Sequence, residues 1–325
     1  MRRVLAAAAL LLVAAGPPWR WNLPVGVEAP SVPASNGMSA ARVELGRRLF
    51  YDADLSANGT MACAACHEQK RAFADGNATR PGVHGDPGRR NVPGLANVAW
   101  FDRLTYADPA ITTLEAQTRV PLLGERPVEM GMKGMEAELA RRLGKDACYR
   151  RMFARAYPER RGRIDMGGVT AALAAFERTM VALDSPYDRH LAGDETALSS
   201  IERQGMAVFA KTGCAACHAG RFMTDMDYHR LEPPQPADPG LMEQTGQGAD
   251  AGRFRTPSLR MVAVTGPWWH DGTAKTLEDA IRRHGGGVSD RDMPALIAFL
   301  HSLTDAHFTT RPDLAMPDRA CGRAL

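Results

Sequence analysis

Apolar residues recur at helical spacing along most of the chain, and runs that alternate like a β-strand are scarce. In ARVELGRRLF at 41–50, the residues Val43, Leu45, Leu49 and Phe50 fall near one helical face. Good helix formers also dominate the later stretches EAELARRLGKDACYRRMFARAY and MGGVTAALAAFERTMVALD. The pattern therefore predicts a mainly α protein with long irregular loops between its helices.

A short unit occurs twice, each time ahead of the sequence Cys-Ala-Ala-Cys-His. In the second copy Ser199 and Glu202 have the spacing of a capping box, which predicts a helix start there. Both copies carry a glycine and a phenylalanine four residues apart before the cysteines: Gly46 and Phe50, then Gly205 and Phe209. This weak internal repeat indicates two related modules.

The segments around these units set the predicted boundaries. The proline-rich stretch PPWRWNLPVGVEAPSVPASNGMSA predicts an extended lead-in. The segment SPYDRHLAGDET at 185–196 predicts a hinge between the modules, and residues 230–252 predict a long polar loop. We therefore divide the chain into a signal peptide at 1–16, a lead-in at 17–38, a first module at 39–188 and a second module at 189–325.

The chain begins with Arg2 and Arg3, followed by an apolar run from Val4 to Ala15. This run is too short to cross a bilayer comfortably and is typical of a secretory signal peptide, with an N-terminal anchor as the alternative. No other stretch of the sequence is apolar enough to cross a membrane. We expect export to the periplasm without a stable membrane span, and the sequence leaves the cleavage site open.

Charge and cysteine content narrow the function further. The 325 residues carry a formal net charge of +3, which falls to about +1 without the two arginines of the signal peptide. A nearly neutral chain argues against binding to nucleic acid or to an anionic membrane surface. Four of the six cysteines lie in the two CAACH motifs, and the sequence leaves open whether the other two, Cys148 and Cys321, form a pair.

Each CAACH motif is the attachment signature of a c-type haem. Two thiols three positions apart on a helical turn can reach both vinyl groups of one porphyrin, and the next histidine can face its iron. A four-cysteine zinc site is the alternative, but zinc does not require a histidine after both cysteine pairs. We predict two covalent haem c groups, attached at Cys63 and Cys66 and at Cys214 and Cys217, with the proximal ligands His67 and His218.

Longer blocks of the chain resemble the bacterial dihaem cytochrome c peroxidase/MauG superfamily. These blocks run from about residue 40 to residue 300 and are LGRRLFYDADLSANGTMACAACHEQKRAFADG, RRNVPGLANVAW, LEAQTRVPLLGERPVEMG and FRTPSLRMVAVTGPWWHDGTAKTLEDAIRRH. The lead-in is further similar to the MbnH-like branch, relatives of MauG that are encoded beside methanobactin-type copper proteins. The resemblance implies two cytochrome c-like haem domains, of which the first reacts with hydrogen peroxide.

The resemblance assigns the catalytic pair at the first haem to Gln117 and Glu129. Cleavage of the O–O bond requires a base that takes the proton from the inner oxygen and returns it to the outer one. A carboxylate in a partly apolar haem pocket can have a pKa raised toward neutrality, which suits this exchange. The alternative for Glu129 is a surface carboxylate beside a turn.

A loop histidine is the next residue that the resemblance raises. In the peroxidase branch a histidine near this position blocks the first iron until the second haem is reduced. Here the equivalent position falls on Val83, one residue from His84, and MauG-like members lack a blocking histidine. We interpret His84 as a solvated loop residue and leave its ligation open.

The resemblance also implies one Ca²⁺ between the haems, held by Asn91, Thr265 and Pro267. An amide oxygen and backbone carbonyl oxygens are ligands that suit calcium. The tryptophan that lies between the two haems in the family corresponds to Tyr106 in this chain. Tyrosine can carry an oxidising equivalent but must lose a proton when it is oxidised, so this position departs from the family.

In the family, the outer ligand of the second haem lies 17 residues after the proline of a Thr-x-Pro motif, which gives His284 here. Thr276 and Asp279 have the spacing of an opening capping box on the predicted helix, and Gly285 predicts its end. One alternative is a histidine that only complements the helix dipole. Three loop side chains are competing ligands: Met223, Met226 and His229.

These features predict a periplasmic dihaem oxidoreductase. Hydrogen peroxide reacts at the first haem, and the second haem relays oxidising equivalents to a protein partner, at a tryptophan side chain. A bis-histidine second haem has a low potential and is poorly matched to cytochrome c. In addition to Tyr106, the residues Trp268 and Trp269 are candidate electron-relay residues, and the alternative is that the two tryptophans only pack in the core. Two other functions compete: a peroxide-detoxifying peroxidase that oxidises reduced cytochrome c, and a non-enzymatic dihaem electron carrier.

Overall fold

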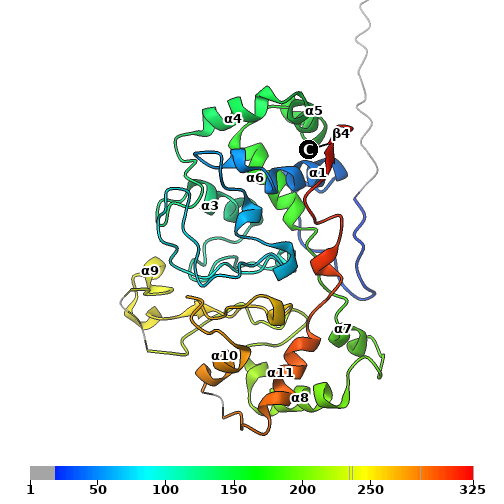
Figure 1. Cartoon of the computed structure of the whole chain (residues 1–325), viewed down its shortest axis with the longest axis vertical. Helices are drawn as coiled ribbons and strands as arrows, with labels where there is room; N and C mark the ends of the chain where they lie inside the picture. The colour runs from blue at the N-terminus through cyan, green and yellow to red at the C-terminus, as the bar shows by residue number, and fades with distance from the viewer. Residues whose placement is uncertain (1–18, 234, 236, 286, 325) are drawn as a thin grey trace, which may run out of the picture.

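The computed structural model describes residues 19–324 apart from residues 234, 236 and 286. The predicted signal peptide at 1–16 therefore lies outside the described residues. Within them the chain is mainly helical, as predicted, and its strands form only short pairs. Two groups of helices lie at opposite ends of the long axis, with irregular loops between them (Figure 1).

The first half of the chain contains α1 (Ala40–Phe50), α2 (Leu114–Gln117), α3 (Arg119–Leu123), α4 (Glu136–Lys145), α5 (Ala147–Ala156) and α6 (Met166–Glu177). The second half contains α7 (Pro186–Leu191), α8 (Ser200–Lys211), α9 (Met242–Thr245), α10 (Leu277–Arg283) and α11 (Met293–Ser302). Two antiparallel strand pairs are formed by β1 (Tyr228–His229) with β2 (Phe254–Arg255) and by β3 (Arg319–Ala320) with β4 (Arg323–Ala324).

In each half, one pair of helices crosses so closely that a side chain between them is excluded. An added Cβ at Gly46 of α1 would lie 1.9 Å from the carbonyl oxygen of Ala172 in α6. An added Cβ at Gly205 of α8 would lie 1.9 Å from the carbonyl oxygen of Ala295 in α11. The phenylalanine one turn later packs on a ring of the opposite helix in both cases: Phe50 on Phe176 at 5.4 Å and Phe209 on Phe299 at 5.2 Å between centroids. The sequence repeat therefore corresponds to the same helix crossing in both modules.

The predicted helix starts are partly reproduced. The capping box at α8 is present, because the Ser199 hydroxyl accepts from the Glu202 N–H and the Glu202 carboxylate accepts from the Ser199 N–H. At α10 the Thr276 hydroxyl accepts from the Asp279 N–H at 3.0 Å. The Asp279 carboxylate instead accepts from the Lys275 N–H at 3.2 Å, so only half of the predicted box forms there.

The predicted hinge at 185–196 contains a helix. Ser185 and Asp188 form a capping box that opens α7. The Asp188 carboxylate also forms an ion pair with Arg260 at 3.0 Å, and the Arg260 side chain is fully buried. The segment is thus fixed to the second module by a contact 72 residues away, which a local reading of the sequence does not reveal.

The described part of the lead-in has little regular structure, as its proline content predicts, and it contacts both modules, since its Gly26 carbonyl accepts from Arg221 of the second module at 3.3 Å. Its Asn36 is buried and donates to a carboxylate oxygen of Glu115 at 2.6 Å and to the carbonyl of Ala171 at 2.8 Å. Its Glu28 carbonyl accepts from the indole N–H of Trp100 at 3.0 Å. The lead-in therefore belongs to the packed structure.

The C-terminal tail returns to the first module (Figure 1). Phe308 and Leu314 are buried in the core that α1 and α6 build, and Tyr51 donates to the Leu314 carbonyl at 2.7 Å. Cys148 and Cys321, which the sequence left open, form a disulfide between α5 and the tail. The boundary at 188/189 stays a prediction, and the tail residues Phe308, Leu314 and Ala320 belong to the core of the first module.

Within the part of the chain that the structure covers, we find no helix with the length and apolar character needed to cross a bilayer.

Candidate haem sites

The two CAACH motifs fold alike. Each pair of cysteines is held on a single 3₁₀ turn, at Cys63–Ala65 and at Cys214–Ala216. The turn is closed by the following histidine in both copies, because the His67 N–H donates to the Cys63 carbonyl at 3.0 Å and the His218 N–H donates to the Cys214 carbonyl at 2.9 Å. The local backbone thus presents two thiols and one imidazole in the same order at both sites.

A backbone carbonyl orients each of these imidazoles. Nδ1 of His67 lies 2.6 Å from the carbonyl oxygen of Phe73, and Nδ1 of His218 lies 3.1 Å from that of Met223. A carbonyl oxygen can only accept, so Nδ1 carries the proton and Nε2 is left as the free ligand atom. Burial lowers the pKa of His67 and lowers that of His218 to about 4, which keeps both rings neutral, as a metal ligand must be.

The two orienting carbonyls were not predicted from the sequence. Phe73 and Met223 both have a left-handed backbone, with φ values of 61° and 53°. This conformation is costly for a bulky residue and is most often found where the surrounding structure imposes it. Both lie five or six residues after their histidine, but the side-chain type gives no signal of a role that the backbone carries.

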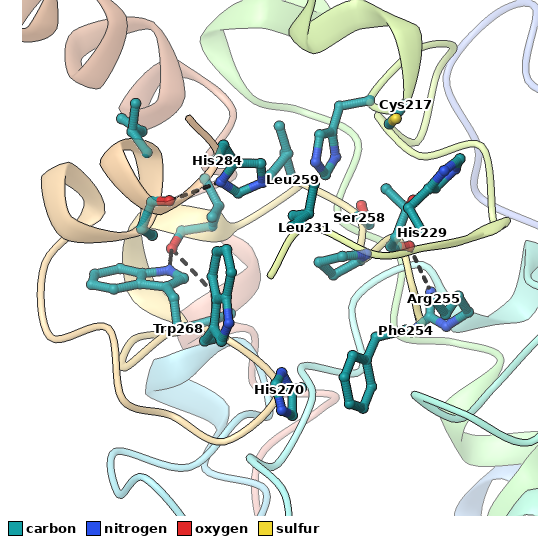
Figure 2. Close-up of a pocket in the computed structure, with 18 of the residues that line it drawn as sticks. Cys217, His229, Leu231, Phe254, Arg255, Ser258, Leu259, Trp268, His270 and His284 are labelled. Atoms are coloured by element: carbon teal, nitrogen blue, oxygen red, sulfur yellow. Dashed lines mark hydrogen bonds between the residues drawn. The ribbon is translucent and has the colours of Figure 1, made fainter. Parts of the chain in front are cut away.

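A cavity of about 420 Å³ adjoins the second motif. Figure 2 shows Cys217 on one side of it and His284 and Trp268 on the other. Much of the remaining wall is apolar, with contributions from Phe209, Leu259, Val262, Leu277, Ile281, Leu296 and Leu300. A concave, mostly apolar space with a few polar groups is the kind of site that a large flat cofactor occupies.

His284 and His218 face each other across this cavity. Their ring centroids are 6.3 Å apart, and Nδ1 of His284 lies 2.8 Å from the carbonyl of Ala280 in its own helix. A metal–imidazole bond of about 2 Å and a nitrogen about 1.1 Å from its ring centroid would put two such centroids about 6.2 Å apart across one ion. The donor set and its spacing therefore fit an iron between the two histidines.

The competing loop ligands have other partners. The Met226 sulfur lies 3.5 Å from the guanidinium of Arg255, and Nε2 of His229 lies 2.8 Å from the Asp225 carboxylate. Met223 is buried and supplies the carbonyl that orients His218. His284 is thus the predicted ligand whose ring is placed opposite His218.

The predicted relay residues and His270 line the same cavity. Trp269 packs edge-on against His284, with centroids 5.2 Å apart, and its indole N–H donates to Glu232 at 3.1 Å. The indole N–H of Trp268 donates to the carbonyl of Val262 at 2.9 Å. Burial raises the pKa of Tyr106 to about 12, which keeps its hydroxyl protonated. His270 stacks on Phe254 with centroids 3.7 Å apart.

At the first site burial is the main cause of the raised pKa values of the Cys63 and Cys66 thiols, and the charge of Glu129 adds a smaller contribution to both. Glu129 is exposed by surface area, yet enough protein surrounds its carboxyl for desolvation to raise its pKa. The raised pKa of Glu129 is compatible with a proton-exchanging carboxyl beside a haem, and the assignment of Glu129 stays a prediction.

Gln117 ends α2, and α3 ties this helix to the segment that carries Glu129. The Met130 N–H donates to the carbonyl of Pro121 and the Met132 N–H donates to that of Leu122, both at 2.9 Å. His84 is exposed on the adjacent loop. That loop is bonded to the same segment, because the Val83 N–H donates to the Glu129 carbonyl at 2.7 Å.

The three predicted calcium ligands also line the cavity beside the second motif. The Asn91 side-chain N–H groups donate to the carbonyls of Asn77 and Ala78, at 3.0 and 3.1 Å, and no donor to its side-chain oxygen is found within the described part of the chain. Among the described residues, neither the Thr265 carbonyl nor the Pro267 carbonyl accepts a hydrogen bond. Three oxygen acceptors without donors fit a hard cation such as Ca²⁺.

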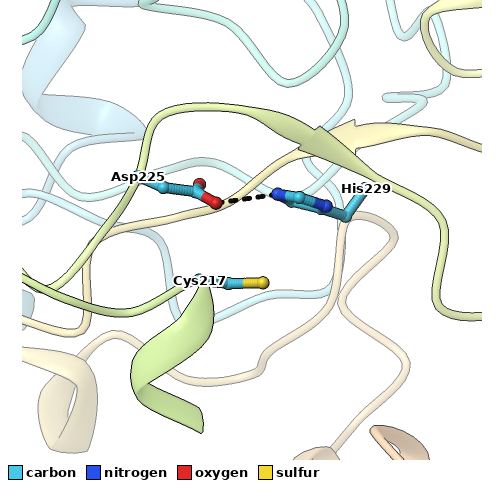
Figure 3. A group of neighbouring side chains, drawn as sticks. All are labelled: Cys217, Asp225 and His229. Carbon is cyan, nitrogen blue, oxygen red and sulfur yellow. Dashed lines mark hydrogen bonds and ion pairs between the residues drawn. The ribbon is translucent and has the colours of Figure 1, made fainter. Parts of the chain in front are cut away.

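Three side chains of types that often bind metal ions lie close together at the second motif. Potential ligand atoms of Cys217, Asp225 and His229 all lie within 4.8 Å of one another. Figure 3 shows the Asp225–His229 pair beside the Cys217 thiol. Because Cys217 is the second cysteine of the haem-attachment motif, we assign no separate metal to this group.

Comparison with known proteins agrees with this geometry. Residues 40–196 match the family model of di-haem cytochrome c peroxidase, and residues 203–304 match that of cytochrome c. The chain is 32% identical to the methylamine utilization protein MauG of Methylophilus methylotrophus over 298 residues, covering 86% of this chain and 84% of MauG. It is 30% identical to the cytochrome c551 peroxidase of Pseudomonas aeruginosa over 280 residues, covering 82% of this chain and 80% of that enzyme.

A solved structure is similar over nearly the whole chain. The crystal structure of a MauG-like protein associated with microbial copper homeostasis superposes with a TM-score of 0.88 at 35% identity. The match covers 93% of this chain and 100% of that protein. The chain belongs to the di-haem cytochrome c peroxidase/MauG family. It has two cytochrome c-like domains, two haem c groups and the activity type of the family, that of a haem peroxidase-type oxidoreductase.

Proposed function

We propose that this protein is a periplasmic enzyme that uses hydrogen peroxide at its first haem and oxidises a tryptophan side chain on a partner protein through its second haem. One observation carries the proposal. Two motifs with the same backbone have different surroundings, since the ring centroids of His218 and His284 lie 6.3 Å apart, whereas the charge of Glu129 acts on the thiols of the first motif. Such a pair suits one reactive site and one electron-storing site.

Each haem would be held by its own motif. Cys63 and Cys66 would form the thioether links at the first site, with His67 as the ligand. Cys214 and Cys217 would form them at the second, where His218 and His284 would both ligate. When bound, the two irons supply the redox chemistry: one accepts the oxidising power of peroxide, and the other shares it.

At the first site the protein's task is to move one proton within bound peroxide. Glu129 would take the proton from the inner oxygen and return it to the outer oxygen, which then leaves as water. Its pKa is raised by burial, so the ionised form is a stronger base than an ordinary carboxylate. Gln117 would donate a hydrogen bond that orients the peroxide beside it.

The electrons that reduce peroxide would come from the partner. One H₂O₂ takes two electrons and two protons to give two waters. The partner tryptophan would lose the same two electrons and two protons while a water oxygen adds to its ring. Tyr106, Trp268 and Trp269 would carry these electrons one at a time, because all three line the cavity of the second site.

The inter-haem region would also hold one Ca²⁺ on Asn91, Thr265 and Pro267. Its charge would be met by oxygen atoms that lack donors among the described residues. Chelation followed by a titration with Ca²⁺ tests this assignment directly. One bound ion per chain is expected, and Asn91→Ala should lose it.

Two observations favour a protein substrate over free cytochrome c. A bis-histidine haem has a low potential, which makes it a poor acceptor for electrons from a high-potential cytochrome. The protein of known structure with 35% identity is described as MauG-like and associated with copper homeostasis. The second candidate is a peroxide-detoxifying cytochrome c peroxidase, which the relatives that carry this name favour. A purely electron-carrying role is disfavoured by the desolvated carboxyl of Glu129.

The test is a reaction of the holoprotein with peroxide in the presence of the product of an adjacent gene. Mass spectrometry should find oxygen added at tryptophan in that partner, with one peroxide consumed for each oxygen. Rapid oxidation of reduced cytochrome c without any modification of the partner would instead establish the second candidate.

A further inference from the structure

A second groove of about 830 Å³ lies where the two modules meet. The first module contributes Lys70 and Arg71 on the turn after its CAACH motif, together with residues 76–78. The second module contributes Lys275 and the segment from Gly266 to Trp268. The groove is therefore built by both halves of the chain and has three cationic side chains along it.

Trp268 forms a wall between this groove and the cavity of the second haem, because it lines both. Trp269 lines only the haem cavity. The Trp268 ring lies so close over Gly266 that an added Cβ there would be 2.7 Å from the ring. Its indole N–H donates to Val262 and its backbone pairs with Ala274 in both directions, at 2.8 and 3.2 Å, so the ring is held in place.

The cations of the groove are only partly neutralised. Lys70 and Arg71 share one carboxylate, that of Glu68, at 3.2 and 3.4 Å. Among the described residues Lys275 has no carboxylate within 4.0 Å of its ammonium group, which donates to the Gly272 carbonyl at 2.7 Å. Asp279 is engaged by the Lys275 backbone N–H and by Arg283. The groove thus presents a net positive charge beside an oxidisable ring.

We propose that this groove receives an acidic segment of the protein substrate, and that Trp268 passes electrons from the substrate to the second haem. The proposal rests on the function proposed above and adds where the partner docks and by which side chain the electron enters. Complementary charge speeds encounter and fixes register, and Trp268 is the aromatic residue that lines both the groove and the haem cavity. In each transfer the partner tryptophan loses one electron to oxidised Trp268, and two transfers with loss of two protons match one H₂O₂.

The first experiment uses the holoprotein, peroxide and two synthetic peptides of equal length. In one peptide a tryptophan is flanked by glutamates, and in the other the same tryptophan is flanked by lysines. Tryptophan oxidation, measured by mass spectrometry, should be about tenfold faster or more for the acidic peptide at low salt. The preference should shrink above about 0.1 M salt, where the screening length falls to about 10 Å.

Two charge reversals locate the effect. Lys275→Glu and Lys70→Glu should each remove or invert the preference for the acidic peptide. Lys145→Glu is the matched control, since it makes the same charge change on the exposed surface of α4 and should keep the wild-type preference. Trp268→Phe should slow peptide oxidation more than Trp269→Phe, while the low-spin ferric signal of the second haem shows that the site remains assembled.

The outcomes separate the two proposals. Equal rates for both peptides in the wild type and in Lys275→Glu would overturn the docking groove and leave protein oxidation standing. A larger loss in Trp269→Phe than in Trp268→Phe would overturn the role of Trp268. A shifted haem reduction potential in Lys275→Glu, with the peptide preference kept, would show that the cations serve the cofactor instead. Failure to oxidise either peptide, with fast oxidation of reduced cytochrome c, would overturn both proposals.

Discussion

The two modules share a scaffold and differ in what surrounds each haem-binding histidine. The same helix crossing at Gly46 and Gly205 supports the same 3₁₀ turn of cysteines, and a left-handed residue orients each histidine. At the second site another imidazole faces His218 across a largely apolar cavity. At the first site burial raises the pKa of the Glu129 carboxyl, whose charge acts on the cysteine thiols.

The cores of the two modules also differ in polarity. In α11 the buried residue after Phe299 is the apolar Leu300, whereas in α6 the buried residue after Phe176 is Glu177. The first module also holds a buried Arg178 that pairs with Glu115 at 2.7 Å. In the proposed function, the repeated backbone geometry binds the cofactor at both sites, and the differing side chains decide whether a site moves protons or stores electrons.

Glu129→Gln is expected to break the first site with the largest effect. Loss of a general acid–base group should slow peroxide consumption by about a hundredfold or more, with little change in the ferric absorption spectrum. Glu125→Gln, four residues earlier and exposed, is the matched control and should behave like the wild type. Unimpaired rates in Glu129→Gln would assign the proton transfer to another group.

The pH dependence of the rate of peroxide consumption is a second test of the role of Glu129. In the proposed mechanism Glu129 acts in its ionised form, and burial raises its pKa above the ordinary glutamate value. The rate should therefore rise with pH through that raised pKa, and this limb should be missing in Glu129→Gln. A profile of the same shape in both proteins would contradict the assignment.

His284→Ala is expected to break the second site with the next largest effect. Changes outside the ligand shell cost about 10–100-fold, and loss of the ligand itself should slow partner oxidation by at least as much. The low-spin ferric signal should also be replaced. His301→Ala, on the exposed face of α11, is the control for a lost histidine. Survival of the original low-spin signal in His284→Ala would show that another residue is the ligand.

Substitution at the helix crossings tests the shared scaffold. Gly46→Ala and Gly205→Ala should each lower the free energy of unfolding by about 1–3 kcal/mol or more, because the new Cβ meets a backbone carbonyl at 1.9 Å. Gly144→Ala in α4 meets nothing within 4 Å and should be stabilising by up to about 1 kcal/mol. Denaturant titration of the holoprotein measures all three, and a neutral Gly205→Ala would contradict the equivalence of the crossings.

The smallest expected effect concerns Glu177. Burial raises its pKa to about 8, so the folded protein keeps a proton that the unfolded chain loses above its lower carboxyl pKa. Stability should therefore fall as pH rises from the ordinary carboxyl range to about 8. Glu177→Gln should flatten this fall and gain about 1–3 kcal/mol near the upper end, the usual cost of an unsatisfied buried group. Equal pH slopes of the melting temperature in both proteins would refute it.

Many of the features that the two modules share can be predicted from the sequence, because each is encoded by a short local pattern. The motif spacing, the glycine and phenylalanine of the crossings, and the capping box at Ser199 are all short-range signals. The helical stretch at 136–157 was predicted without its break, although Asp146 caps a new helix by accepting from the Cys148 N–H at 2.7 Å. An aspartate followed by good helix formers is compatible with either structure, so the pattern alone does not place the break.

Other features depend on contacts that no local pattern records. The pairing of Cys148 with Cys321 spans 173 residues. The helix within the predicted hinge is fixed by Arg260, and the lead-in is fixed by Asn36. The carbonyls of Phe73 and Met223 act through the backbone, so their residue type is uninformative. Resemblance to a family indicated Glu129 and His284, and only the structure relates each to its motif.

The measurement that tests the central claim most directly is electron paramagnetic resonance of the fully loaded ferric protein before and after cyanide. We predict one high-spin and one low-spin ferric signal of equal intensity, with cyanide converting only the high-spin signal. Two low-spin signals that both ignore cyanide, or two high-spin signals that both respond to it, would show that the two motifs do the same job and would contradict the division between a reactive site and a storage site.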